Sequence, residues 1–456
     1  MLHDRVVCVD TVIEGGQVVT PGGVATTDVA IADGKIVAFG ARLRGGDRVP
    51  ARGLWVLPGA IDGHTHMQAP AFGRTTRDTF ASGSRAAAAG GVTTFLDFTV
   101  GSGATALADD VEKRTSEAGA SLVDFGLHAE VVAWSDGRAE EIPRAVAGGV
   151  PSFKFYTVYA ERLTYDELAR AFAAVAAAGG VAMVHAEDLE VVERASSAIA
   201  PADRRRMAAF PRSRPPESEA SAVAHLCEIA AASGARLHIA HVSTAAAAAA
   251  IARAKARGVR VTAETCPHYL LLDESAYARE DGRLWSVVPP LRSPDDRAAL
   301  WSALEDGTID TVATDHCPFA RADKEGAEDV LAMPCGLSGV ETLLPLVASE
   351  GVAGRRLPLA RLARALAENP ARIFGLAPAK GTIAVGADAD LVLFDPARAW
   401  TVSAADLHSA TDLSPWEGFA VRGRVVRTFA RGRCAVAARE FPTDVATGPF
   451  VPRRLV

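Results

Sequence analysis

The sequence predicts an α/β protein: a (β/α)8, TIM-like barrel with a small β-sandwich domain formed by both chain termini. Three observations support this fold. Strand-like and helix-like segments alternate through the middle of the chain, the helix-like segments often end at glycine, and both flanks hold short β-like runs. We expect the β-sandwich domain at residues 1–57 and, with a tail, at 377–456, and the barrel at 58–376.

The barrel prediction depends on eight strand-like cores, each followed by a segment with helical periodicity. Pairs such as Gly90-Gly91, Gly148-Gly149 and Gly179-Gly180 lie where helices are expected to end and feed the next strand. Eight such units fit a (β/α)8 barrel with insertions. The expected strands are residues 60–66, 93–99, 123–129, 152–156, 181–186, 236–242, 259–264 and 309–315.

The flanks carry short β-like runs separated by Gly and Asp turns. At the N-terminal side these are residues 5–12, 29–32 and 35–39; at the C-terminal side they are 389–394 and 421–426. Two β-rich ends around one barrel predict a single small β-domain to which both termini contribute.

Composition narrows the function classes. The chain has 456 residues, 49% of them hydrophobic, and a net charge of -7, which argues against nucleic acid or an anionic membrane as the main partner. We see no signal peptide and no apolar run of ~20 residues. The six cysteines form no CxxC pair, so we expect free thiols and a cytoplasmic location.

Candidate metal ligands lie at the ends of the expected strands. His64 and His66 are two residues apart at the end of the first strand, so both imidazoles point to the same side. Because chemistry in this fold gathers at the carboxyl ends of the strands, these residues are expected to converge with others. The ligand set suits zinc, with manganese, iron or cobalt as alternatives. The other candidates are Lys154, His185, His241 and Asp315.

Lys154 is an unusual ligand candidate because a protonated amine binds metal poorly. Burial and nearby positive charge favour the neutral amine, which can add carbon dioxide and become a carbamate. Such a carbamate on Lys154 could bridge two metal ions. The alternative is an ordinary lysine that reaches solvent or pairs with Glu187.

The chain resembles the cyclic amidohydrolases, in particular the dihydropyrimidinase and hydantoinase branch, over nearly its whole length. The resemblance implies two divalent metal ions, usually zinc, on a carboxylated Lys154, with His64, His66 and Asp315 at one ion and His185 and His241 at the other. It also implies a homo-oligomer, a dimer or tetramer, and a small cyclic ureide or amide as substrate. The matching segments are residues 58–67, 90–94, 152–154, 184–187, 241–243, 264–270, 289–292, 314–319, 336–341, 369–371 and 380–391.

The implied reaction is metal-dependent hydrolysis of a cyclic amide, which opens a hydantoin or dihydropyrimidine to an N-carbamoyl amino acid. A metal-bridging hydroxide would attack the ring carbonyl. Tyr159, five residues after Lys154, would stabilise the oxyanion, and Asp315 would carry the proton to the leaving nitrogen. We expect Glu187 and Asp97 to fix imidazole tautomers from behind.

The substrate-binding residues depart from the family pattern. The family's Ser before Pro-Pro-Leu-Arg is Val288 here, and its Asn before Gly is Cys335. In the loop 68–79 we expect Phe72 to form an apolar wall for the ring substituent. Arg74 and Arg77 in the same loop offer the alternative of an anionic substituent.

Three other functions stay open. The Pro267–Leu270 segment also occurs in allantoinase-like members, although Tyr159 and Cys317–Phe319 favour the hydantoinase branch over an allantoinase or dihydroorotase-like enzyme. A mononuclear deaminase shares the His-x-His pattern, but Lys154 argues against it. A non-catalytic assembly or signalling homologue would have lost its ligands, and here all six positions remain.

Overall fold

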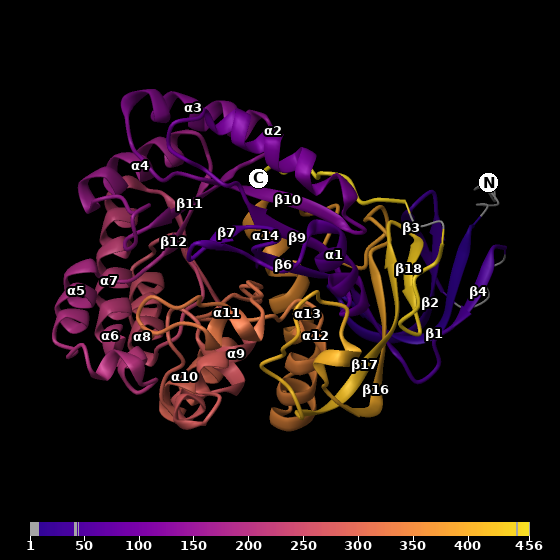
Figure 1. The fold of residues 1–456 in the computed structure, drawn as a ribbon. Helices are drawn as coiled ribbons and strands as arrows, with labels where there is room; N and C mark the ends of the chain where they lie inside the picture. Colours follow the sequence, from indigo (N-terminus) through magenta and orange to yellow (C-terminus); the bar gives the residue numbers. More distant parts are fainter. Residues whose placement is uncertain (1–8, 41–42, 44, 444–445, 456) are drawn as a thin grey trace.

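The computed structural model describes residues 9–40, 43, 45–443 and 446–455. It shows a barrel surrounded by helices and, at one side of it, a mixed β-sheet (Figure 1). Within these ranges every helix falls short of the length or apolarity that a membrane span requires.

The barrel consists of eight parallel strands that neighbour each other in chain order, which confirms the predicted fold. The last strand is short, and a parallel bridge between Thr65 and His316 brings the first strand against the segment that follows it. The strands are β6 (Ala60–Thr65), β9 (Val92–Phe98), β10 (Asp124–Glu130), β11 (Ser152–Tyr156), β12 (Val181–His185), β13 (Arg236–Ile239), β14 (Val261–Thr265) and β15 (Thr311–Val312).

Helices alternate with the strands and cover the barrel (Figure 1). Side chains at their first turns accept hydrogen bonds from free backbone N–H groups, as Thr79, Thr164 and Ser293 do in complete capping boxes. Gly234 ends a long helix in the left-handed conformation (φ 69°), which glycine adopts without steric cost. The main covering helices are α1 (Phe80–Ala89), α2 (Leu107–Glu117), α3 (Asp136–Ala147), α4 (Tyr165–Ala177), α7 (Pro216–Ser233), α8 (Ala245–Ala256) and α10 (Pro294–Asp306).

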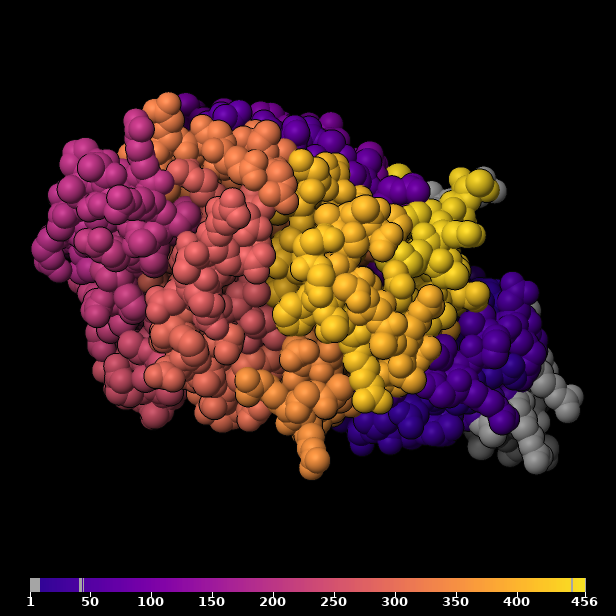
Figure 2. Space-filling model, turned by 60° about the horizontal axis from the view of Figure 1, so that its bottom comes forward, coloured from indigo at the N-terminus to yellow at the C-terminus, as the bar shows by residue number. Residues whose placement is uncertain are grey.

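Strands from both ends of the chain form one continuous eight-stranded sheet, as the flanking β-runs predicted; residues 5–8 of the first run lie outside the described residues. Antiparallel pairing of β5 with β16 joins the two halves, and Ile13, Val56 and Leu391 lie in their shared apolar core. Figure 2 shows the yellow C-terminal segments against the indigo N-terminal ones. The strands are β1 (Thr11–Thr20), β2 (Gly23–Ala32), β3 (Lys35–Phe39), β4 (Asp47–Pro50), β5 (Trp55–Pro58), β16 (Leu391–Thr401), β17 (Ala420–Ala430) and β18 (Arg433–Ala437).

The C-terminal tail leaves this sheet and returns to the barrel. It runs under the amino ends of the barrel strands, where Val451 N donates to Phe125 O (2.7 Å) and Arg453 N donates to Gly149 O (2.9 Å). The Arg453 side chain is fully buried and donates to the carbonyl oxygens of Phe374 and Leu127. The tail therefore covers the face of the barrel opposite the carboxyl ends of the strands.

A buried ammonium group joins the sheet to the barrel. Lys380 Nζ lies 2.6 Å from Asp124 at the start of β10, 2.7 Å from Asp390 and 3.1 Å from Asp388, and its side chain is 2% exposed. Although burial disfavours the ammonium, the charges of Asp390, Asp124 and Asp388 raise the pKa of Lys380 above its ordinary value. Lys380 therefore stays charged and neutralises carboxylates from both parts of the fold.

Replacing Lys380 with methionine is expected to destabilise the protein by roughly 3–5 kcal/mol, because it leaves buried carboxylates without their cation. The measurement is the free energy of unfolding in denaturant. The control is Lys35→Met: Lys35 also pairs with Asp388 (2.5 Å) but is 47% exposed, so its loss should cost about 0–1 kcal/mol. Equal stabilities of the two variants would contradict the assigned role of Lys380.

Candidate metal centre and substrate cavity

A cavity of about 600 Å³ lies at the carboxyl ends of the barrel strands. Every residue that the sequence analysis singled out as a metal ligand, catalytic group or substrate contact lines it, although these residues come from seven separate segments of the chain. They are His64, His66, Phe72, Lys154, Tyr159, His185, His241, Val288, Asp315 and Cys335.

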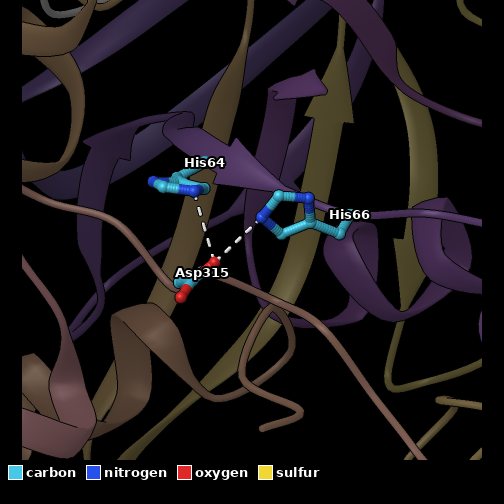
Figure 3. Close-up of side chains that lie close together, drawn as sticks. All are labelled: His64, His66 and Asp315. Atoms are coloured by element: carbon cyan, nitrogen blue, oxygen red, sulfur yellow. Dashed lines mark ion pairs between the residues drawn. The ribbon is translucent and has the colours of Figure 1, made fainter. Parts of the chain in front are cut away.

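His64, His66 and Asp315 form the tightest group in this cavity. Oδ1 of Asp315 lies 3.2 Å from Nε2 of His64 and 3.0 Å from Nε2 of His66. Figure 3 shows both imidazoles beside the Asp315 carboxylate. One donor atom from each residue lies within 4.8 Å of the others. Although burial opposes its ionisation, the neighbouring histidines hold the pKa of Asp315 well below its usual range. The group thus offers two imidazole nitrogens and a carboxylate to one cation.

Glu264 orients His64, a role that the sequence analysis missed. Its carboxylate lies 2.5 Å from Nδ1 of His64 and 3.3 Å from Nε2 of His238. Burial raises the pKa of Glu264, but the interactions with His64 and His238 bring this pKa below its ordinary value, so the carboxylate stays ionised. The proton of His64 is therefore held on Nδ1, and the lone pair of Nε2 faces the cavity. The position of Glu264 at the end of an expected strand was the available signal.

His185 and His241 lie next to each other, with ring centroids 4.6 Å apart. Glu187 accepts a hydrogen bond from Nε2 of His185 (2.8 Å), which confirms the expected role of Glu187 and leaves Nδ1 as the remaining donor atom. Nδ1 of His241 is buried and has no hydrogen-bond partner among the described residues. A buried polar atom without a partner is costly, and a metal site relieves such costs.

Arg214 holds Glu187 in its ionised form. The guanidinium lies 2.5 Å from the Glu187 carboxylate. Burial raises the pKa of Glu187, but the charge of Arg214 and the hydrogen bond from His185 lower this pKa to about 2. Asp97, the other carboxylate expected to orient an imidazole, instead accepts from Met67 N (2.8 Å) and pairs with Arg114 (2.6 Å). That expectation was wrong, because the Asp97 carboxylate supports the backbone after His66 and not a ring.

Lys154 is buried and lines the cavity. Its Nζ lies 4.9 Å from the ring centroid of Phe98 and 5.3 Å from that of Tyr156. The carboxylate of Glu187 pairs with His185 and Arg214, so the alternative of a Lys154–Glu187 ion pair is wrong. Burial lowers the pKa of Lys154, which favours the neutral amine.

Backbone conformation is unusual at four of these residues. Phe72 (φ 51°), Tyr159 (φ 72°), His241 (φ 36°) and Asp315 (φ 50°) all lie in the left-handed region, which residues other than glycine rarely adopt. Such conformations cost about 1–3 kcal/mol each and persist where the surrounding structure enforces them. Their concentration in one cavity supports a functional site.

Tyr159 and Phe72 lie at the outer part of the cavity. The Tyr159 ring is 5.1 Å from the His185 ring, and burial raises the pKa of Tyr159 above its ordinary value, so its hydroxyl remains a donor. Phe72 is 42% exposed and contacts Phe319 edge-on. Val288 and Cys335 lie on the wall, at the positions where the family pattern has Ser and Asn.

Arg74 and Arg77 both form ion pairs with Asp323. Both guanidinium groups lie beside Asp323, at 3.5 Å and 4.0 Å, and neither residue belongs to the described lining. The structure therefore gives no support to the alternative that these arginines bind an anionic ring substituent.

The donor set fits divalent cations. Four imidazoles, one carboxylate and one lysine line the same cavity, and carboxylates hydrogen-bonded to two of the rings select their tautomers.

The Amidohydrolase family matches residues 55–435 of this chain. The chain is 36% identical over 451 residues to a D-hydantoinase of Geobacillus stearothermophilus, with 97% of this chain and 96% of that protein covered. It is 40% identical over 438 residues to an allantoinase of Rubrobacter xylanophilus, with 93% of each covered.

Solved structures of a dihydropyrimidinase and of a hydantoinase share the fold of this chain. The dihydropyrimidinase from Brevibacillus agri superposes with a TM-score of 0.95 at 34% identity, covering 97% of this chain and 98% of that one. The L-hydantoinase from Arthrobacter aurescens does so with a TM-score of 0.91 at 32% identity, covering 98% and 100%.

Glu264→Gln is expected to weaken divalent-metal binding by about 10–100-fold, because an amide can donate to Nδ1 of His64 and so favour the wrong tautomer. Metal affinity is measured by competition with a coloured chelator. The control is Glu341→Gln, since Glu341 is another buried carboxylate bonded to a histidine, His408 (3.0 Å), but does not line the cavity. Unchanged affinity in Glu264→Gln would show that Glu264 does not orient a ligand.

Proposed function

Because the chain belongs to the amidohydrolase family, we propose that it opens a hydantoin or dihydropyrimidine ring to an N-carbamoyl amino acid. It is a cyclic amidohydrolase, a hydrolase of C–N bonds in cyclic amides. The observation that carries the proposal is the convergence of all six predicted ligand residues in one cavity of a chain whose relatives are hydantoinases and dihydropyrimidinases.

We further propose that the site holds two divalent ions, zinc by the chemistry of its ligands. His64, His66 and Asp315 would hold one ion, and His185 and His241 the other. Lys154 would join them as a carbamate, formed when its neutral amine adds carbon dioxide and releases a proton. The burial of Lys154, which lowers the pKa of its amine, and the orphaned Nδ1 of His241 support this assignment. A cytoplasmic homo-oligomer remains a prediction from the sequence.

When bound, the ions would supply an acidified water molecule and polarise the ring carbonyl. The remaining work falls to residues of the chain. Asp315, ionised and beside His64 and His66, would accept the proton of the attacking water and deliver it to the ring nitrogen as the C–N bond breaks. The hydroxyl of Tyr159 would donate to the carbonyl oxygen as negative charge develops there.

The expected substrate profile follows from the cavity. Hydantoin, dihydrouracil and their forms with an apolar 5-substituent should be opened by the zinc-loaded enzyme faster than allantoin or dihydroorotate. Apolar side chains such as Phe72 line the cavity and offer little to the polar ureido group of allantoin, and no arginine in the described lining could hold the carboxylate of dihydroorotate. The measurement is kcat/KM from chromatography of the N-carbamoyl products. A preference for dihydroorotate or allantoin would contradict this profile, and ammonia release without ring opening would indicate a deaminase.

Lys154→Ala is expected to lose most bound metal and most activity, because it removes the group proposed to join both ions. Short carboxylic acids added to this variant should restore part of both, since a free carboxylate can occupy the place of the carbamate. Metal content and ring-opening rate are measured with and without acetate or propionate.

Asp315→Asn provides the matched comparison for Lys154→Ala. It should retain much of the metal but lose turnover by ~10²–10⁴, the effect of removing a general acid-base. Full activity of Lys154→Ala, or the same metal loss in both variants with no rescue by acids, would contradict the bridging role of Lys154.

A further inference from the structure

One side of the cavity carries negative charge that the proposed reaction does not use. Apart from the six predicted metal-centre residues, the charged side chains in the described lining are Glu130 and Glu161, and both are acidic. Arg74 and Arg77, the cations of the 68–79 loop, lie beside Asp323, so in the described structure neither forms an ion pair with these carboxylates.

Glu130 lies beside the metal centre because of strand register. It ends β10, and its register partner on β11 is Lys154. Register partners on neighbouring parallel strands point to the same side, so both side chains reach the same rim of the barrel. The Glu130 side chain is therefore one strand away from Lys154, a residue of the proposed metal centre.

Hydrogen bonds hold the Glu130 carboxylate in place but use only part of its capacity to accept them. It accepts hydrogen bonds from the Tyr156 hydroxyl (2.6 Å) and from Gly101 N (3.2 Å). A carboxylate has about four acceptor positions, so about two stay open. Glu130 is half-buried and lines the cavity, so these positions are accessible to a bound molecule.

Apolar side chains line the same cavity as Glu130. They include Phe72, Val100 and Val132, and Glu161, also in the lining, is exposed to solvent. A cavity with apolar side chains and a carboxylate suits a substituent with an apolar stem and a cationic tip, as lysine and arginine side chains have.

We propose that Glu130, positioned by Tyr156 and assisted by Glu161, selects ring substrates whose exocyclic substituent ends in an ammonium or guanidinium group on an apolar stem. This inference rests on the proposed function, because it names the substituent of a ring that the metal centre opens. It refines the expected apolar wall around Phe72, which would hold the stem but not the tip.

The test compares two hydantoins of nearly equal size, 5-(4-aminobutyl)hydantoin and 5-pentylhydantoin. The wild-type, zinc-loaded enzyme should prefer the aminobutyl compound in kcat/KM by about tenfold or more, the equivalent of about 1.4 kcal/mol. Glu130→Gln should remove this preference. Because the two rates are measured on one preparation, their ratio is insensitive to partial loss of metal or of folded protein.

Three further variants separate a specificity role from a structural one. Tyr156→Phe removes the hydroxyl but keeps the carboxylate, so a reduced preference for the aminobutyl compound should persist. Glu161→Gln should lower the preference less than Glu130→Gln, since Glu161 is exposed to solvent. Arg74→Ala should leave the ratio unchanged, because Arg74 does not line the cavity.

Calorimetric binding of the same two hydantoins keeps this inference independent of turnover. Tighter binding of the aminobutyl compound that disappears in Glu130→Gln supports the inference even if neither ring is opened, in which case only the proposed function fails. A wild-type preference for the pentyl compound, or a ratio that Glu130→Gln does not alter, would overturn the inference while ring opening itself would stand.

Discussion

The site depends on how the barrel closes between its first strand and the short last one. β15 contains two residues, so regular strand pairing cannot bring β6 against it. The buried carboxylate of Asp62 does so by accepting hydrogen bonds from Thr314 N (3.0 Å) and the Thr314 hydroxyl (2.5 Å). His66 N then donates to His316 O (2.8 Å). Asp315, between Thr314 and His316, is thereby held against His64 and His66.

Buried carboxylates fix the orientation of two imidazoles in the cavity. Glu264 and Glu187 each accept from the ring nitrogen of a different histidine, which sets the tautomer and leaves the other nitrogen toward the cavity. Each carboxylate also has a second partner, His238 for Glu264 and Arg214 for Glu187, that limits its movement. The geometry of the site is thus fixed by hydrogen bonds on the far side of the rings, where they do not compete with a metal ion.

The sequence was informative where the relevant relation is local. Two-residue spacing in His64 and His66, and polar residues at the ends of apolar segments, require only the alternation of a strand and the direction of a parallel barrel. Such local relations could not predict the role of Glu264, because Glu264 forms its hydrogen bond with a histidine 200 residues earlier in the chain. The expected role of Asp97 was wrong for a related reason. Its strand was predicted correctly, but its carboxylate pairs with Arg114, a buried arginine of α2. The return of the tail to the base of the barrel has no periodic signal at all.

One strand pair contributes two charged side chains to the cavity. Lys154 and Glu130 are register partners; Lys154 is one of the predicted ligands, and Glu130 is the residue that we propose selects the ring substituent. Solved structures of a D-hydantoinase and of an L-hydantoinase both share this fold. Val288 and Cys335, the two expected departures from the family pattern, line the same cavity as the six predicted ligands. Residues that touch the substituent can therefore change without disturbing the closure of the barrel or the carboxylates behind the histidines, because neither network of hydrogen bonds includes them.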